Sequence, residues 1–214
     1  MLKGTAIETA YYKMLRVRIV PGLISWNLTP DHITCCGLLT SLLAAVCFTF
    51  SPFAGGLLTL LTGLLDTLDG SLARATGKSG QFGAYFDSVT DRYTEFIIYL
   101  GIWFYFSGGA PRTHYRLVIL FILFGSLMVS YTRARAEGLG EICTGGTFQR
   151  GERILLLGVA GILNPLLNRI FTLNSIAPPT DPGLKCVLIV LALGTNLTAM
   201  WRFMHVLNKL RKKV

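Results

Sequence analysis

Four aspartates stand close together in a part of the chain where charged residues are otherwise scarce. The 214 residues include eleven Asp and Glu, and four of these eleven are Asp66, Asp69, Asp87 and Asp91. Each of the four adjoins an apolar stretch long enough to form a helix. Because a charge inside an apolar layer costs several kcal/mol, acids in such places are functional candidates by default.

The spacing of these aspartates predicts that their carboxylates meet. At about 100° per residue, Asp66 and Asp69 fall on one face of a helix. Asp87 and Asp91 are four residues apart and therefore share a face of the next helix. The turn over 76–82 is short, so we expect the second helix to fold back against the first. All four carboxylates would then converge at one end of this hairpin.

Converging carboxylates repel one another and take up protons unless a cation neutralises them. Oxygen ligands without nearby His or Cys favour a hard ion, Mg²⁺ or Mn²⁺. Two such ions bridged by shared carboxylates are the usual arrangement for displacement at phosphorus. The alternative is an ion-pair network with Arg74 and Arg92, but two arginines do not balance four aspartates and Glu95. The residues therefore favour two divalent metal ions as cofactors.

The composition indicates an integral membrane protein. Hydrophobic residues make up 52% of the chain and charged residues only 14%, against about 25% in soluble domains. No charged residue lies between positions 32 and 65, which is enough for more than one span at roughly 20 residues each. The net charge of +9 then fits an anionic membrane surface and anionic substrates, and we expect no nucleic acid partner.

The pattern of apolar stretches predicts an all-α integral membrane protein. The expected transmembrane helices cover 33–50, 52–75, 84–107, 114–137, 152–172 and 184–207, with a Gly, Pro, Asn or Ser cluster at each break. Residues 5–20 have the periodicity of an amphipathic helix that lies on the membrane surface, and Pro21-Gly22 is expected to end it. We therefore divide the chain into an interfacial helix over 1–22 and a six-helix domain over 23–214.

Basic residues predict the orientation in a cell membrane. One side of the predicted bundle has Lys3, Lys13, Arg16, Arg18, Lys78, Arg150, Arg153, Lys209, Arg211, Lys212 and Lys213. The other side has only Arg112, Arg116, Arg169 and Lys185. By the positive-inside rule, both termini and the clustered aspartates of this multi-pass protein lie near the cytoplasmic face.

The region over 66–91 also carries a specific motif. It reads Asp-Thr-Leu-Asp-Gly-Ser-Leu-Ala-Arg over 66–74, and Gly83, Asp87 and Asp91 follow at fixed intervals. With this motif the chain resembles the CDP-alcohol phosphatidyltransferase family over essentially its whole length. The resemblance implies six spans after an interfacial helix, a homodimer, and transfer of a phosphatidyl group from CDP-diacylglycerol or a related CDP-lipid to a small alcohol, with release of CMP.

The resemblance also implies roles for individual residues. The four motif aspartates would bind two metal ions, and Asp91 would also take the proton from the acceptor hydroxyl. Gly70 and Ala73 would let the nucleotide approach the helix, and Arg74 would bind the pyrophosphate or orient the acids. The full set that the resemblance places beside the CDP-lipid is Gly70, Ala73, Arg74, Ser79, Asp31 and Thr34.

A group of arginines in the second half of the chain bears on the acceptor. Its members are Arg133, Arg135, Arg150, Arg153 and Arg202. One interpretation is that they anchor helix ends at the cytoplasmic surface. The other is a pocket for a phosphorylated acceptor, since guanidinium groups suit phosphate oxygens. This pattern resembles the prokaryotic phosphatidylinositol-phosphate synthases, in which residues at the positions of Arg133, Arg153 and Arg202 line the inositol-phosphate site.

Three functional hypotheses therefore stand at this point. The first is transfer of a phosphatidyl group to inositol phosphate. The second is the same reaction with glycerol 3-phosphate, serine or another polyol as acceptor. The third is a non-enzymatic cation-binding membrane protein. The third has less support, because transport sites usually lie near the middle of the membrane on interrupted helices, whereas these acids lie near one face.

Overall fold

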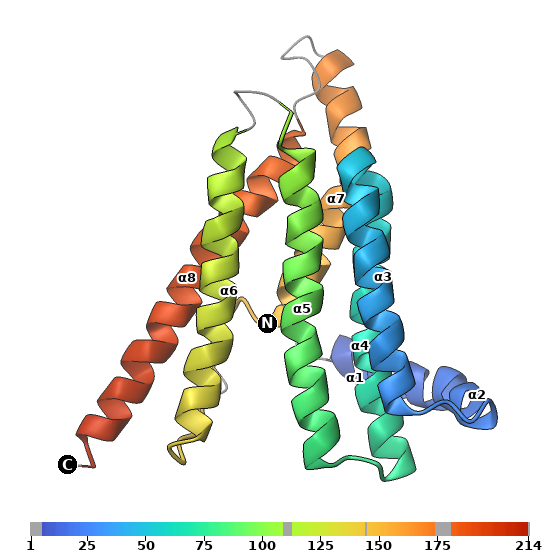
Figure 1. Ribbon diagram of the computed structural model, residues 1–214, viewed down its shortest axis with the longest axis vertical. Helices are drawn as coiled ribbons and strands as arrows, with labels where there is room; N and C mark the ends of the chain where they lie inside the picture. Colours follow the sequence, from blue (N-terminus) through green and yellow to red (C-terminus); the bar gives the residue numbers. More distant parts are fainter. Residues whose placement is uncertain (1–5, 109–112, 144, 174–180, 214) are drawn as a thin grey trace.

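The computed structural model describes residues 6–108, 113–143, 145–173 and 181–213, and these residues contain helices and no strand (Figure 1). Six long helices follow a short N-terminal helical segment. They are α3 (Pro30–Phe50), α4 (Pro52–Thr76), α5 (Gln81–Tyr105), α6 (Thr113–Glu137), α7 (Arg150–Leu173) and α8 (Pro182–Arg211). A helix thus lies over each predicted range, and the observed ends differ from the predicted ones by a few residues.

The ends of the helices follow from local sequence chemistry. Thr29 caps α3 by accepting a hydrogen bond from the His32 amide, and the His32 side chain accepts one from the Thr29 amide in return. Ser51 has an extended backbone, so it separates α3 from α4 while its side chain caps α4. Gly77, at a φ of 67°, ends α4 in the left-handed region that glycine adopts most easily. These signals place the acid-bearing end of α4 next to the short turn into α5.

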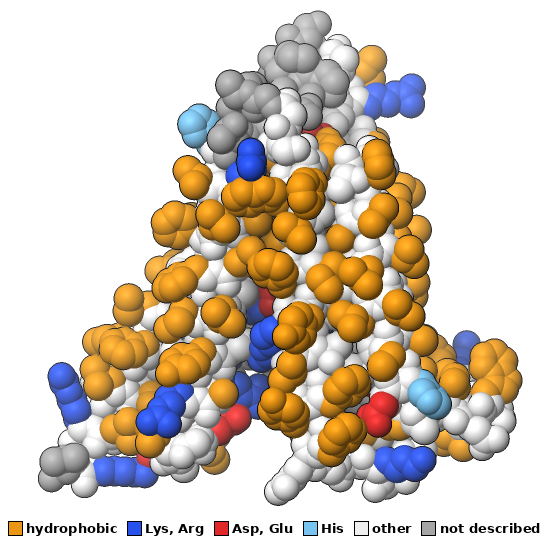
Figure 2. Space-filling model, in the orientation of Figure 1, with side chains coloured by type: hydrophobic (Ala, Val, Ile, Leu, Met, Phe, Trp, Pro, Cys, Tyr) orange, Lys and Arg blue, Asp and Glu red, His pale blue; other side chains and the backbone are white. Residues whose placement is uncertain are grey.

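The helices are long and apolar enough for a multi-pass membrane protein. The helices α3, α7 and α8 and residues His114–Glu137 of α6 each qualify as membrane spans by length and hydropathy. The two remaining long helices, α4 and α5, have 25 residues each and carry the clustered aspartates. Apolar side chains cover the sides of the helices in Figure 2. Such a surface suits lipid, because a soluble protein rarely exposes large apolar patches.

The helices pack in a way that leaves the acid-bearing pair apart. Helix α3 packs against both α4 and α5, α7 packs on α4, and α8 packs on α6 and α7. The expected direct packing of α5 against α4 is not found among the helix pairs that pack extensively in the described residues. Both helices are instead held by α3. In Figure 1, α6 and α8 also lean away from this group toward the lower end. Space for side chains and ligands is therefore left between α4 and α5.

Three glycines bring α7 very close to α4. A Cβ added to Gly56 would lie 2.6 Å from the carbonyl oxygen of Gly158 and 2.9 Å from the Cα of Gly161. Small residues at such a contact let helix backbones approach each other within a membrane. This approach directs the first turn of α7 toward the acid-bearing end of α4.

The N-terminal segment runs across the lower end of the bundle in Figure 1. It consists of α1 (Ala6–Met14), the π-helical η1 (Leu15–Ile19) and α2 (Val20–Ser25). The prediction that Pro21-Gly22 ends this helix is wrong, because helical backbone continues to Ser25. Pro21 lies in the first turn of α2, where a missing N–H costs no helical hydrogen bond.

Contacts with α4 fix the position of this segment. Leu15 is fully buried and clusters with Leu68 and Leu72 of α4. The hydroxyls of Tyr11 and Thr67 are hydrogen-bonded at 2.7 Å. Thr67 lies between the two motif aspartates of α4, so the N-terminal segment packs directly behind the acid cluster.

Candidate metal and substrate site

The four motif aspartates project from α4 and α5 into one region of the bundle. Asp69 is only 6% exposed, and the hydroxyl of Thr34 on α3 donates to its Oδ2 at 2.8 Å. Three helices therefore build the site, and Thr34 lies within the acid cluster itself. Threonine satisfies one lone pair of this buried carboxylate without adding charge.

Three of the four carboxylates form a group of a size suited to a metal ion. Asp66, Asp69 and Asp87 each offer an oxygen, and these oxygens all lie within 4.8 Å of one another. Asp87 Oδ1 is buried and accepts no hydrogen bond from the residues that the structure describes. A buried acceptor without a donor usually has a water or ion as its partner. The donor set is made of hard oxygens, so these residues fit a divalent cation such as Mg²⁺ or Mn²⁺.

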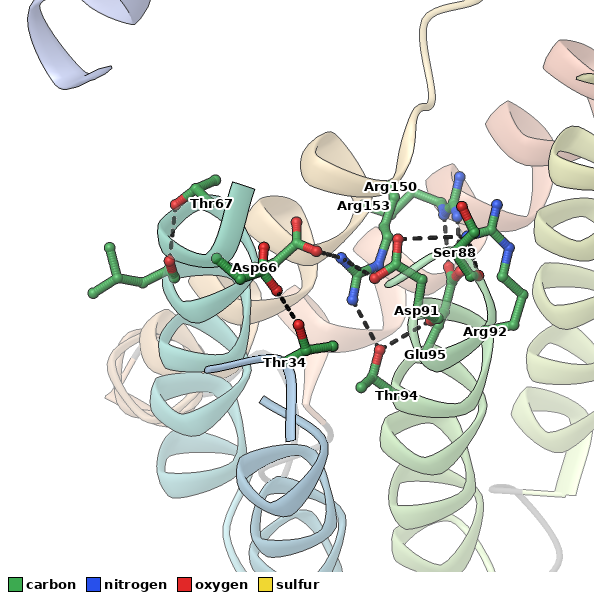
Figure 3. A network of polar contacts seen from close by, with 12 residues as sticks. Thr34, Asp66, Thr67, Ser88, Asp91, Arg92, Thr94, Glu95, Arg150 and Arg153 are labelled. Carbon is green, nitrogen blue, oxygen red and sulfur yellow. Dashed lines mark hydrogen bonds and ion pairs between the residues drawn. The ribbon is translucent and has the colours of Figure 1, made fainter. Parts of the chain in front are cut away.

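The fourth aspartate, Asp91, lies in a different environment. One Arg150 nitrogen, Nη1, contacts Asp91 Oδ1 at 2.8 Å and also forms an ion pair with Asp66 Oδ1. The other terminal nitrogen, Nη2, donates to Thr94 Oγ1 at 2.8 Å. Arg92 approaches Asp91 at 3.4 Å. Figure 3 shows the Arg150 guanidinium between Asp66 and Asp91, so it links α7 to both acid-bearing helices.

Arg150 lies in the acid cluster, although the sequence does not predict it there. It was expected among the arginines of the acceptor site, and Arg74 and Arg92 were weighed as partners of the aspartates. Arg92 does contact one aspartate, but Arg74 lies over the Tyr12 ring at 5.7 Å from its centroid and donates to Ser71. A separation of 84 residues joins Arg150 to Asp66, so no local spacing could signal this pair.

The residues expected to bind the CDP-lipid lie in three places. Thr34 is committed to Asp69 within the acid cluster. Gly70 and Ala73 are half-buried on α4 beside Arg74, which lines an open pocket together with Tyr12, Arg16 and Ser71. Ser79 in the turn before α5 and Asp31 in the first turn of α3 are both exposed. Tyr12 and Arg16 were predicted only as part of a surface helix, because their approach to α4 depends on the tertiary fold.

Arg153 is buried and fully engaged with protein groups. Its side chain donates to both carboxylate oxygens of Glu95, at 2.6 and 2.7 Å, and to the carbonyl oxygen of Phe148 at 2.8 Å. Glu95 lies on α5 one turn after Asp91, so this ion pair is next to the acid cluster (Figure 3). Both partners are less than a tenth exposed. The bidentate geometry ties the start of α7 to α5.

Arg202 on α8 is also buried, at 3% exposure. It donates to the carbonyl oxygens of Val129 on α6, at 2.7 Å, and of Gly145 in the connection to α7, at 2.8 Å. Arg133 and Arg135 near the end of α6 are exposed, and Arg133 pairs with Glu137 at 2.8 Å. The acceptor assignment of these arginines stays a prediction.

The surface is hollowed where α6 and α8 lean away from α3, α4 and α5. Figure 2 shows this hollow in the lower half of the molecule, with Lys, Arg, Asp and Glu side chains inside an otherwise apolar surface. A narrow cavity lies at the acid cluster. Its lining includes Asp66, Asp69, Asp87, Asp91 and Arg150. The arrangement combines carboxylates for a cation with nearby guanidinium groups for anions, which suits transfer of a phosphate-containing group.

Comparison with known proteins agrees with this chemistry. The sequence profile of the CDP-alcohol phosphatidyltransferase family matches residues 27–207. The chain belongs to the CDP-alcohol phosphatidyltransferase family. Residues 66–91, with all four motif aspartates, lie inside the matched region.

Named relatives and solved structures are also similar to this chain. It is 40% identical over 150 residues to an archaetidylinositol phosphate synthase of Pyrococcus horikoshii, covering 69% of this chain and 76% of the relative. A phosphatidylinositol phosphate synthase of Mycobacteroides abscessus is 31% identical over 148 residues, 68% of this chain and 67% of the relative.

Two crystal structures of the Mycobacterium tuberculosis phosphatidylinositol phosphate synthase match the fold with a TM-score of 0.76 and 27% identity. The first has CDP-DAG bound and the match covers 91% of this chain and 94% of that one. The second is a complex with manganese and citrate, covering 89% and 88%.

The Glu95–Arg153 pair yields a prediction about stability. Replacing Glu95 with Gln leaves the Arg153 guanidinium buried without a countercharge, which costs about 3–5 kcal/mol. We expect Glu95→Gln to lower the free energy of unfolding in detergent by this amount. Glu137→Gln is the matched control, because it removes an exposed Glu–Arg pair worth at most about 1 kcal/mol. Equal stability of the two variants would contradict the importance of the buried pair.

Proposed function

We propose that the chain transfers the phosphatidyl group of CDP-diacylglycerol, or of a related CDP-lipid, to inositol phosphate and releases CMP. The observation that carries this proposal is the meeting of the motif carboxylates with a group of arginines at the same end of the bundle. The relatives from Pyrococcus and Mycobacteroides support inositol phosphate as acceptor, since both are named as synthases of inositol phosphate lipids.

We further propose that two metal ions, Mg²⁺ or Mn²⁺, are held by Asp66, Asp69, Asp87 and Asp91. When bound, such ions offset the negative charge of the pyrophosphate and of the leaving CMP. The three-carboxylate group of Asp66, Asp69 and Asp87 supports one of these ions directly. The hydrogen bond from Thr34 holds the Asp69 carboxylate in place. Because it uses only one of the two oxygens, the other oxygen is left for the metal ion.

Asp91 serves as the general base in this proposal. Its carboxylate takes the proton from the acceptor hydroxyl while that oxygen attacks the phosphorus bonded to the lipid, and the bond from this phosphorus to CMP breaks. Arg92 contacts the Asp91 side chain and orients it. Because Asp91 belongs to α5 and the acceptor arginines to α6, α7 and α8, the attacking hydroxyl would enter from the hollow seen in Figure 2.

The residues that bind the two substrates are also part of the proposal. For the acceptor phosphate we propose Arg133, Arg135, Arg150, Arg153 and Arg202. For the CDP-lipid we propose Gly70, Ala73, Arg74, Ser79, Asp31 and Thr34. The exposed arginines can contact the phosphate directly, and the buried ones place positive charge beneath it while they fix the connection between α6 and α7.

The arrangement in the membrane is part of the proposal. All six long helices span the bilayer, the N-terminal segment over 1–22 lies on its surface, and residues 23–214 form the catalytic domain. Both termini and the acid cluster face the cytoplasm, supported by the distribution of Lys and Arg. A homodimer is expected from the family resemblance.

A CMP-release assay tests the function. Purified protein in detergent or lipid is given CDP-diacylglycerol, or the corresponding ether lipid, with inositol phosphate, inositol, glycerol 3-phosphate or serine. We expect CMP release that depends on inositol phosphate and on Mg²⁺ or Mn²⁺, and that EDTA abolishes. CMP release with glycerol 3-phosphate but not with inositol phosphate would contradict the proposed acceptor. No CMP release with any acceptor would contradict the proposed function.

The base assignment predicts the effect of Asp91→Asn. Turnover should fall by roughly 100- to 10,000-fold, because the neutral amide cannot accept the proton. The measurement is CMP release under saturating substrates, with thermal unfolding as the check that the variant is folded. A folded Asp91→Asn protein with wild-type turnover would exclude Asp91 as the base.

The acceptor site predicts a selective effect of Arg133→Ala. The KM for inositol phosphate should rise about tenfold, as expected when one charge-assisted hydrogen bond is lost. The KM for the CDP-lipid should stay unchanged. Arg169→Ala is the control, because Arg169 is an exposed arginine near the opposite end of α7. If both variants keep wild-type dependence on inositol phosphate, Arg133 only anchors the helix end.

A further inference from the structure

The acid cluster has two unlike halves. Asp66, Asp69 and Asp87 form the three-carboxylate group, and neither Asp69 nor Asp87 has an ion-pair partner among the described residues. The space between Asp66 and Asp91 is instead taken by the guanidinium of Arg150, whose side chain is 14% exposed. One half is therefore open to a divalent cation, while a protein cation lies in the other.

A single nitrogen of Arg150 makes both carboxylate contacts. Nη1 reaches Asp66 Oδ1 on α4 and Asp91 Oδ1 on α5, so it occupies the place between these two carboxylates. A guanidinium and a metal ion cannot both bridge the same two oxygens at contact distance. Binding of a cation there would require Nη1 to leave at least one carboxylate.

Arg150 has alternative partners when it leaves this position. Nη2 donates to Thr94 on the neighbouring turn of α5, and Nε is buried without a hydrogen-bond partner among the described residues. An unused charged donor beside a transferase site suits an anionic oxygen such as that of a phosphate. The side chain thus remains anchored at Thr94 and can turn toward an anion.

From this geometry we infer that Arg150 competes with the second divalent cation for the carboxylates of Asp66 and Asp91. When this cation binds, it displaces the guanidinium from them. This inference rests on the proposed function for the identity of the metal ligands. It makes the two cation positions unequal, because two of the three carboxylates that hold the first ion, Asp69 and Asp87, have no ion-pair partner among the described residues, whereas Arg150 lies between Asp66 and Asp91. The second ion binds more weakly, and its arrival frees Arg150 for a phosphate oxygen.

Titration with Mn²⁺ followed by electron paramagnetic resonance tests this without any substrate or turnover. In wild-type protein we expect two classes of Mn²⁺ site with different dissociation constants. In Arg150→Gln the dissociation constant of the weaker class should fall about tenfold, as expected when a competing charge-assisted contact is removed, and the tighter class should change little. Arg150→Lys keeps the charge but loses the fork, so it should give an intermediate value.

Arg92→Gln is the matched control, because it removes a positive charge that also contacts Asp91 but does not bridge two carboxylates. Its effect on the weaker class should be clearly smaller than that of Arg150→Gln. The inference is overturned if Arg150→Gln and Arg150→Lys leave the weaker class unchanged or weaken it, if Arg92→Gln tightens it equally, or if wild-type protein binds a single Mn²⁺. CMP release by wild-type protein with any of these results would leave the proposed transfer reaction standing. A single Mn²⁺ would also remove the two-ion site, whereas the other results would remove only the role of Arg150.

Discussion

Four carboxylates lie at one end of two apolar helices, and the surrounding structure must compensate their negative charge. Each uncompensated charge in such a place is expensive, and the cost rises when like charges face one another. The protein supplies only part of the compensation, through one neutral donor at Asp69 and two guanidinium groups at Asp91. The remaining negative charge and the hard oxygen donors suit the cluster to divalent cations.

The same constraint accounts for the arrangement of the helices. Because α4 and α5 are both held by α3 and do not pack extensively on each other, their carboxylates face a shared space. Helix α7 approaches α4 through glycine contacts and delivers Arg150 and Arg153 from consecutive turns. Arg153 then joins Glu95, and Arg202 holds the carbonyl groups of the α6–α7 connection. Arg150 and Arg153 in this way place positive charge beside the acid cluster.

Much of this could be predicted from sequence, because its determinants are local. The spacing of Asp66 with Asp69, and of Asp87 with Asp91, defines helix faces, and the turn residues define where helices end. The motif also predicts the family, which is confirmed, and the family indicates the class of reaction. The continuation of the N-terminal helix past Pro21 was missed, because proline is tolerated in a first helical turn and the preceding backbone is π-helical.

Tertiary contacts account for what the sequence could not reveal. The partnership of Arg150 with Asp66 spans 84 residues, and the pairing of Arg153 with Glu95 spans 58. In the sequence these arginines resemble ordinary basic residues at a helix end, and Arg133 and Arg135 do lie exposed near the end of α6. Only the approach of α7 to α4 and α5 separates the arginines that balance carboxylates from those that remain exposed.

The central claim is that the acid cluster is a divalent-cation site of a lipid transferase. Anomalous diffraction from crystals grown with Mn²⁺ tests it most directly, because it locates the ions without reference to activity. The account predicts an anomalous peak bound by oxygens of Asp66, Asp69 and Asp87, the three carboxylates that already lie within 4.8 Å of one another. Ordered protein without a peak at these carboxylates, or with Mn²⁺ bound only elsewhere, would contradict it.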